Sequence, residues 1–207
     1  MYNLIYPTID KLKENTELYD SWKAKYPTND LNEYSRYAHK YSEFVFLSGI
    51  IVCTLSYENN QINRNFIKMV GTPQDIINKF IEFNDNFVDS NKFYVGYDIQ
   101  YEFSLIIKNM VKYDVTIPNN FKYYLDMKPW ENQFFLDIKY LWKFGDTYGM
   151  YSELNDIANF MGFKRAMPIT NMSILSQLDV QNNSDRIIRE GMNYVNTYAQ
   201  IMKKIIK

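Results

Sequence analysis

The sequence predicts an α/β domain in which helices flank a mixed central sheet of about five strands. Three observations support this fold class: β-rich runs cluster in the first third of the chain, a helical pattern follows them, and strand and helix patterns then alternate. A length of 207 residues suits one domain with a sizeable core, and residues 1–207 are assigned to that single domain. The composition, 46% hydrophobic and 23% charged, is typical of globular proteins.

The predicted strands dominate the first third of the chain. Residues 3–7 form a first strand, in which Pro7 marks an end or an edge because proline has no N–H to donate. Residues 12–42 are polar and aromatic, and we interpret them as an insertion of short helices. The β-rich runs 46–56 and 62–70 are separated by a polar turn, which predicts a β-hairpin.

The predicted helices follow the hairpin. Thr72, Pro73 and Asp75 have the order of an N-cap, a first-turn proline and an acid three residues after the cap, which predicts a helix start. Beyond that helix we expect a strand at 93–98, a helix at about 99–113, a segment of mixed character at 134–142, a helix at 151–163 and a last helix that begins near Ser184.

Charge and hydropathy limit the partners. The net charge of −1 argues against sequence-blind nucleic-acid binding, which requires a basic face. The apolar stretch FVFLSGIIVCTL is too short for a membrane helix, and the first residues lack the order of a signal peptide, so we expect no membrane contact. The single cysteine, Cys53, is expected to be a small core residue, and a chain without an internal disulfide suits the reducing cytoplasm.

Aromatic residues are abundant, with nineteen tyrosines and fourteen phenylalanines. Tyrosine is favoured at interfaces, so a tyrosine-rich surface predicts a protein partner, and single-stranded nucleic acid is the second partner considered. The alternative explanation is a codon bias, because Asn, Lys and Ile are also plentiful. Trp142 and Phe144 are expected in the core, and the placement of Trp22 and Trp130 stays open.

Four stretches of the chain carry a likeness to a known family. They are MYNLIYPTID, EYSRYAHKYSEFVFLSGIIVCTLSY, FYVGYDIQYEFSLIIKNM and KPWENQFFLDIKYLWKFGDTYGMYSELNDIANFMGF. Together they resemble the 3′–5′ exonucleases related to the proofreading domain of family B DNA polymerases, which belong to the ribonuclease-H-like DEDD superfamily. The fourth stretch is the most specific, because it is similar to the family's Lys-Pro-Trp-Glu and Leu-Trp-Lys-Phe-Gly-Asp. The resemblance implies the ribonuclease-H-like exonuclease fold.

The same resemblance implies a two-metal active site. Such exonucleases hold two Mg²⁺ or Mn²⁺ ions between four carboxylates, and the ions clamp the attacking and leaving oxygens of the phosphodiester. In this chain the first-motif Asp falls on Thr8 and its Glu on Asp10. The second motif's Asn falls on Asp98 and its Asp on Glu102, and a further Asp of the family is retained as Asp137.

The last motif of the family, a Tyr, three residues and then an Asp, is not intact. Depending on the register, its Asp falls on Asn193 or Tyr194 and its Tyr on Arg189 or Glu190. No register supplies both residues, and the only histidine, His39, lies in the predicted insertion. Two of the four metal-site acids are therefore missing, and the two that remain have an altered reach.

These substitutions predict an exonuclease-like pseudo-enzyme that needs no cofactor. Lost charges weaken the attraction for divalent ions, and a changed side-chain length misplaces the remaining oxygens, so we expect no useful cleavage. Such a protein would be retained as a binding or structural module, for example within a viral particle or a replication complex. The alternative is an active single-strand 3′–5′ exonuclease with a rearranged site, in which Asp10 and Glu102 hold Mg²⁺ or Mn²⁺.

The candidate acids also have structural interpretations. Asp10 follows a strand and can start a turn. Asp98 precedes a predicted helix and can cap its N-terminus, and Glu102 lies in the first turn of that helix, where an acid is favourable.

Overall fold

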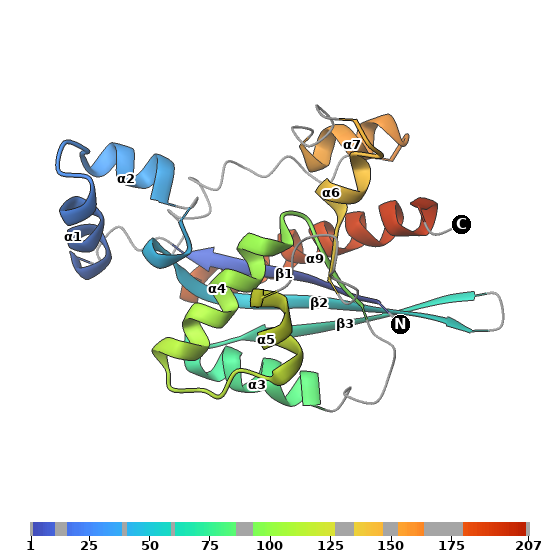
Figure 1. Cartoon of the computed structure of the whole chain (residues 1–207), viewed down its shortest axis with the longest axis horizontal. Coiled ribbons are helices and arrows are strands. Elements are labelled where there is room, and N and C mark those ends of the chain that lie inside the picture. The colour runs from blue at the N-terminus through green and yellow to red at the C-terminus, as the bar shows by residue number, and fades with distance from the viewer. Residues whose placement is uncertain are drawn as a thin grey trace.

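The computed structural model describes residues 2–10, 16–38, 41–58, 61–85, 93–126, 135–146, 153–163 and 180–205. They form an α/β structure in which helices cover both faces of a mixed five-stranded sheet (Figure 1), and this confirms the predicted fold class at that level. The strands are β1 (Tyr2–Asp10), β2 (Phe46–Glu58), β3 (Gln61–Val70), β4 (Phe93–Gly96) and β5 (Phe135–Asp137). The helices are α1 (Thr16–Lys25), α2 (Leu31–Tyr37), the 3₁₀ turn η2 (Ser42–Phe44), α3 (Pro73–Asp85), α4 (Ile99–Lys112), α5 (Asn119–Asp126), α6 (Ile138–Trp142), α7 (Leu154–Phe160) and α9 (Val180–Ile205).

The strands lie in the order β3-β2-β1-β4-β5, so the first strand is central. The predicted hairpin is present, and its strands β2 and β3 pair from Glu58↔Gln61 to Gly49↔Val70. β1 is antiparallel to β2 and parallel to β4, and β5 continues the parallel side. The parallel strands therefore end at the same edge of the sheet.

β1 is longer than predicted and runs through Pro7. Its pairing with β4 extends only from Tyr2 to Leu4, whereas its pairing with β2 continues to Asp10. At Pro7 the strand is therefore paired on one side only, where the missing N–H is tolerated. A register shift follows between Thr8 and Ile9.

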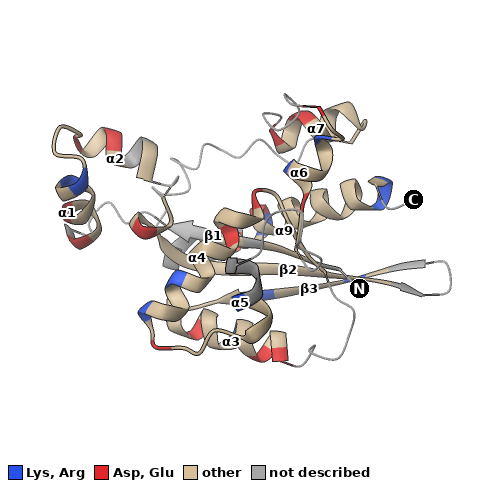
Figure 2. Cartoon of the chain, in the orientation of Figure 1, with Lys and Arg blue, Asp and Glu red and all other residues tan. Residues whose placement is uncertain are grey.

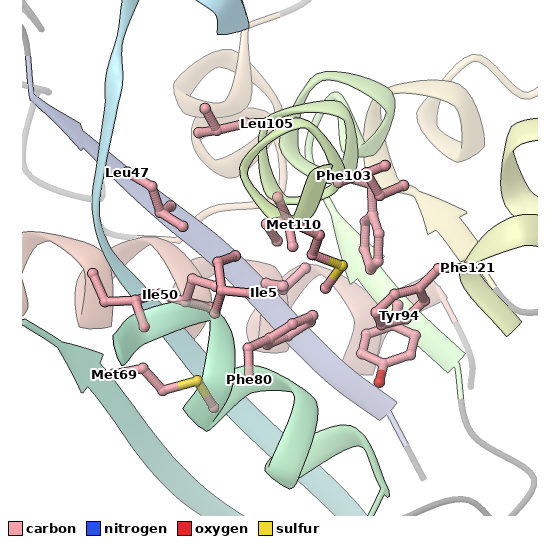
Figure 3. Packing of buried hydrophobic residues seen from close by; sticks show 14 of the residues in the cluster. Ile5, Leu47, Ile50, Met69, Phe80, Tyr94, Phe103, Leu105, Met110 and Phe121 are labelled. Carbon is pink, nitrogen blue, oxygen red and sulfur yellow. The ribbon is translucent and has the colours of Figure 1, made fainter. Parts of the chain in front are cut away.

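The two faces of the sheet carry separate apolar layers. Ile5 and Ile50 point to the face covered by α3 and α4, where Phe80 and Phe103 pack with the rings of Tyr94 and Phe121 (Figure 3). The neighbouring residues along the strands point the other way and pack under α9, as the alternation of a strand requires. This second layer includes Leu4, Ile51, Cys53 and Val95.

Two core predictions concern single residues. Cys53 is fully buried, and burial raises the pKa of its thiol to about 11, in keeping with its expected role as a core residue. The expectation for Phe144 is wrong, because its side chain is 72% exposed in the turn after α6. Trp142 is partly buried, since it lies between the α9 layer and the surface. Trp130 lies outside the described residues.

The predicted insertion is confirmed as short helices. α1, α2 and η2 extend from one side of the sheet (Figure 1) and enclose an aromatic cluster of their own around the buried Trp22. Tyr34, Tyr41 and Phe44 contact its ring at centroid distances of 5.3 to 5.8 Å. Trp22 is therefore a core residue of this small layer.

Several element boundaries differ from the predicted ones. The capping pattern at Thr72 is present, since its hydroxyl accepts the Asp75 N–H at 3.2 Å and donates to the Asp75 carboxylate at 2.7 Å. The segment 134–142 resolves into β5 followed directly by α6, and α9 begins at Val180, before the expected start. α5 has no counterpart among the predicted elements. None of the described helices is both long and apolar enough to cross a membrane.

Phe80→Ala should lower the free energy of unfolding by about 3–5 kcal/mol, because the ring is fully buried between α3 and the sheet and its loss leaves a cavity. Phe160→Ala makes the same chemical change at a ring that is 83% exposed, and it should cost less than about 0.5 kcal/mol. Urea denaturation followed by circular dichroism measures both. Equal losses would contradict the assigned core.

Candidate functional site

Three of the predicted site acids converge where β4 and β5 end. Asp137 is the last residue of β5, and it pairs in register with Gly96, the last residue of β4. Asp98 follows Gly96 by two residues, and Glu102 lies in the first turn of α4. The carboxyl ends of parallel strands are the usual place for a ligand in an open α/β sheet.

The Asp137 carboxylate accepts hydrogen bonds from backbone N–H groups at the starts of α4 and α6. One carboxylate oxygen accepts the backbone N–H groups of Asp98 at 3.1 Å and of Lys139 at 2.9 Å, and the other accepts the N–H of Ile99 at 3.0 Å. Burial raises the pKa of Asp137, and these N–H groups act in the opposite direction. Both oxygens of this carboxylate are therefore engaged by the fold itself.

Asp98 does not cap α4 with its side chain, so that structural interpretation is wrong. Its backbone is left-handed, with φ 61° and ψ 48°, a conformation that Asp tolerates better than most residues. Its carboxylate instead pairs with the Lys139 ammonium at 3.2 Å. The cap of α4 comes from Asp137 on the neighbouring strand, because the left-handed turn presents the Asp98 and Ile99 N–H groups to that carboxylate.

Glu102 is the buried member of the group, with 4% of its surface exposed. Its Oε1 accepts a hydrogen bond from the Tyr198 hydroxyl at 3.2 Å, and the backbone N–H of Tyr97 also acts on this carboxyl group. Burial raises the pKa of Glu102 well above its ordinary value, and the charge of Asp137 adds to the increase. Glu102 lies in the first turn of α4 as expected, and burial and the Asp137 charge both disfavour its ionised form.

Gly96 makes room for the Glu102 carboxyl group. A Cβ atom at this position would lie 1.8 Å from Glu102 Oε2 and 2.9 Å from its Cδ. Any side chain at the end of β4 would therefore displace the carboxyl group. The glycine directly before Tyr97-Asp98 is the sequence signal that could have indicated this close approach.

Further acids from α7 act on the same region. The pKa of Tyr97 is raised mainly by burial, and next by the negative charges of Glu153, Asp98, Asp137 and Asp156. Glu153 and Asp156 form the capping box of α7. Lys139 also lies here, with its ammonium 5.8 Å from the centre of the Tyr97 ring. The described acids Glu153, Asp98, Asp137 and Asp156 and the Lys139 ammonium therefore all lie near Tyr97.

The remaining predicted positions lie on β1 and α9. Thr8 and Asp10 pair with Gly49 and Phe46 of β2, and their side chains lie outside the described part of the chain. Asn193 is exposed on α9, and its backbone carbonyl accepts the Thr197 hydroxyl.

α9 reaches the acids through a residue that the sequence did not single out. Tyr198 lies one turn beyond Tyr194, the other candidate position of the last motif, and it is Tyr198 that bonds to Glu102. Tyr194 is itself buried in the apolar layer under α9. The last motif would have had to be aligned one helical turn further along the chain, at Tyr198, to identify this contact.

The described acids do not fit a divalent metal ion as they stand. Asp137 already accepts three backbone N–H groups, Asp98 pairs with an ammonium, and burial raises the pKa of Glu102. Among the side chains that the structure describes, no three acidic, histidine or cysteine residues are arranged to hold a metal ion. The Asp10 side chain is not among them, so its expected part in Mg²⁺ or Mn²⁺ binding stays a prediction.

No protein-family model, curated protein or solved structure matches this chain.

Glu102→Gln should change how stability depends on pH. The pKa of Glu102 is raised in the folded protein, so the folded state keeps a proton that the unfolded chain releases above about pH 4.5. The wild-type free energy of unfolding then falls with rising pH, by at most about 1.4 kcal/mol per pH unit for one group. Glutamine has no such proton, so the variant should gain stability relative to the wild type as the pH rises above the ordinary pKa of a glutamate.

Urea denaturation across this pH range measures the difference. Glu82→Gln, at an exposed glutamate of α3, is the matched control and should give a constant difference. The charge of Asp137 acts on Glu102, so the wild-type slope belongs to the interacting pair, and Glu102→Gln reports the loss of one member of that pair. A Glu102→Gln difference that does not vary with pH would show that Glu102 titrates normally.

Gly96→Ala should destabilise the protein by about 1–3 kcal/mol, because the new methyl group overlaps the Glu102 carboxyl group. The same change should cost less in a Glu102→Ala background, where the overlapping atoms are gone. A double-mutant cycle should therefore show coupling of about 1 kcal/mol or more between the two positions. Strictly additive losses would place the origin of the Gly96 effect elsewhere.

Proposed function

We propose that the chain is an exonuclease-like domain that does not cleave phosphodiesters and acts as a binding or structural module. The proposal rests on the resemblance in four sequence stretches and on the state of the acids at the ends of β4 and β5. One observation carries it: both oxygens of Asp137 accept backbone N–H groups of the fold. A carboxylate used in this way has little capacity left to hold a metal ion.

The charges beside Asp137 support the same conclusion. The Lys139 ammonium occupies a position 3.2 Å from Asp98 Oδ2, and a divalent ion bound there would have to displace it. Glu102 favours its neutral form, which is a poor ligand for Mg²⁺. Three acids that converge at the strand ends thus have structural partners in place of ions.

The arrangement of the elements is compatible with the ribonuclease-H-like fold that the resemblance implies. After the short helices of the insertion are set aside, three strands, a helix, a strand and a helix follow one another, which is the order that the sequence pattern predicted. The order β3-β2-β1-β4-β5 brings the candidate acids of β4 and β5 to one edge of the sheet. We therefore assign the chain to that fold as part of the proposal.

An active 3′–5′ single-strand exonuclease is the second candidate. The convergence of Asp98, Glu102 and Asp137 favours it, because carboxylates gathered at strand ends are what a two-metal site requires. In that case Asp10 would complete the site, and Lys139 would turn away when metal binds.

The purified protein should leave a 5′-labelled single-stranded DNA intact in the presence of Mg²⁺ or Mn²⁺. The reason is that Asp137 accepts three backbone N–H groups, Asp98 pairs with the Lys139 ammonium, and burial raises the pKa of Glu102. Gel analysis after prolonged incubation at high protein concentration is the measurement. Glu102→Gln and Asp137→Asn should leave this negative result unchanged while altering stability.

Metal-dependent shortening from the 3′ end would support the second candidate if Asp10→Ala or Glu102→Gln abolishes it. Exposed acids provide the matched control, since Glu82→Gln should not affect a genuine activity of this site. Shortening that survives all of these substitutions would come from a contaminant.

A further inference from the structure

β3 is an edge strand whose outer side is not paired within the described part of the chain. It stands first in the strand order β3-β2-β1-β4-β5, and all ten of its residues pair with β2. Among the described residues, no backbone group outside β2 forms a hydrogen bond with the backbone of β3. A long open edge can accept an added strand, because its outward N–H and C=O groups repeat the pattern inside the sheet.

The register of the hairpin shows which backbone groups of β3 point outward. Glu58 and Gln61 flank a connection of two residues, so they form a hydrogen-bonded pair, and hydrogen-bonded and non-hydrogen-bonded pairs alternate from there. The N–H and C=O groups of every second residue therefore face away from β2. This outward set includes Arg64, Phe66, Lys68 and Val70. The Val70 carbonyl accepts a hydrogen bond from the Lys79 ammonium of α3 at 3.1 Å, which agrees with the assignment.

The side chains of the outward set bring positive charge to this edge. Phe66 packs against the apolar layer under α9, and the exposed side chains of Arg64 and Lys68 lie two residues to either side of it on the same face. The Arg64 guanidinium donates to Asn196 Oδ1 at 2.8 Å, a neutral partner, and no described acid forms an ion pair with either cation. β3 contains no acidic residue, so Figure 2 shows blue and no red along this strand.

These charges decide which partner suits the edge. A second copy of β3 would bring the same cations and no acid, and like charges on neighbouring strands are destabilising. A nucleic acid has no backbone ladder to pair with a strand, and its binding depends on many phosphate contacts, for which Arg64 and Lys68 are few. An extended acidic peptide meets both requirements, because its backbone continues the ladder and its carboxylates can stand opposite the two cations.

We propose that β3 receives an extended acidic peptide of a partner protein as an added antiparallel strand. Residues directly opposite each other in an antiparallel pair share a face of the sheet. The peptide therefore carries the pattern acid, any residue, apolar residue, any residue, acid, with the acids opposite Arg64 and Lys68 and the apolar side chain opposite Phe66. This inference goes beyond the proposed function and does not depend on whether the acids at the strand ends cleave a phosphodiester.

Fluorescence anisotropy of a labelled peptide, Thr-Glu-Thr-Val-Thr-Glu-Thr, tests the charge pattern when the protein is titrated from about 1 µM to about 1 mM. The wild type should bind this peptide saturably and bind Thr-Lys-Thr-Val-Thr-Lys-Thr at least ~10-fold more weakly. Lys68→Glu, at an exposed side chain, should weaken binding of the acidic peptide at least ~5-fold and strengthen binding of the lysine peptide. Lys112→Glu, at an exposed side chain of α4, is the matched control and should change neither affinity.

Methylated peptides test the backbone ladder without changing any charge. In the proposed register the N–H of the central valine donates to the Phe66 carbonyl, whereas the N–H groups of the two neighbouring threonines point away from β3. N-methylation of the valine should therefore weaken binding of the acidic peptide at least ~10-fold. N-methylation of the threonine that follows it should leave the affinity within about 2-fold, because no ladder hydrogen bond is lost.

Four outcomes would overturn the proposal. The wild type could show no saturable binding of the acidic peptide, it could bind both charge versions equally, Lys68→Glu could behave like Lys112→Glu, or the two N-methylated peptides could bind with the same affinity. The last result would mean an ionic contact without strand addition. Binding of a short oligothymidylate in place of the acidic peptide, lost in Lys68→Glu, would assign this edge to nucleic acid and also overturn the proposal.

Discussion

Asp137 accepts hydrogen bonds from three backbone N–H groups, and these bonds connect the end of β5 to the starts of α4 and α6, where the candidate site lies. α4 starts after a left-handed residue, so its first N–H groups point to the neighbouring strand and not to a side chain of their own segment. The carboxylate at the end of β5 satisfies them, and it also starts α6. Loss of this group would leave part-buried N–H donors without partners at both helix starts. The direction of α4 across the sheet therefore rests on an acid that lies 39 residues from Asp98 and 38 residues from Ile99 in sequence.

The position of α4 in turn determines the environment of Glu102. The first turn of the helix brings this carboxyl group against Gly96, where no Cβ stands in its way, and the Tyr198 hydroxyl of α9 reaches it from the other side of the sheet. The buried Glu102 is thus the point at which the end of β4, the first turn of α4 and helix α9 meet. Such an acid is costly unless it is neutral or has a specific task. Its partners within the fold are the Tyr198 hydroxyl and the close-packed backbone at Gly96.

The sequence predicted the strands and the capped helix well, because hydrophobic alternation and the Thr72 capping pattern are local signals. The resemblance also singled out Asp98, Glu102 and Asp137, which lie together where β4 and β5 end. The state of those acids was not predictable, since the burial of Glu102 depends on Tyr198 and Gly96, and the engagement of Asp137 depends on the left-handed backbone at Asp98. Phe144 was placed in the core on its apolar character alone, and only the backbone geometry of the turn directs it outward.

The order of the elements along the chain also has a consequence for biosynthesis. β1 is the central strand and leaves the ribosome first, whereas α9, which covers one face of β1 and β2, follows about 170 residues later. At a usual elongation rate of ~5–20 residues per second, the apolar face that carries Leu4, Ile51 and Cys53 waits about ten seconds or more for its cover. During that interval the apolar side chains of this face lack the helix that covers them in the folded protein.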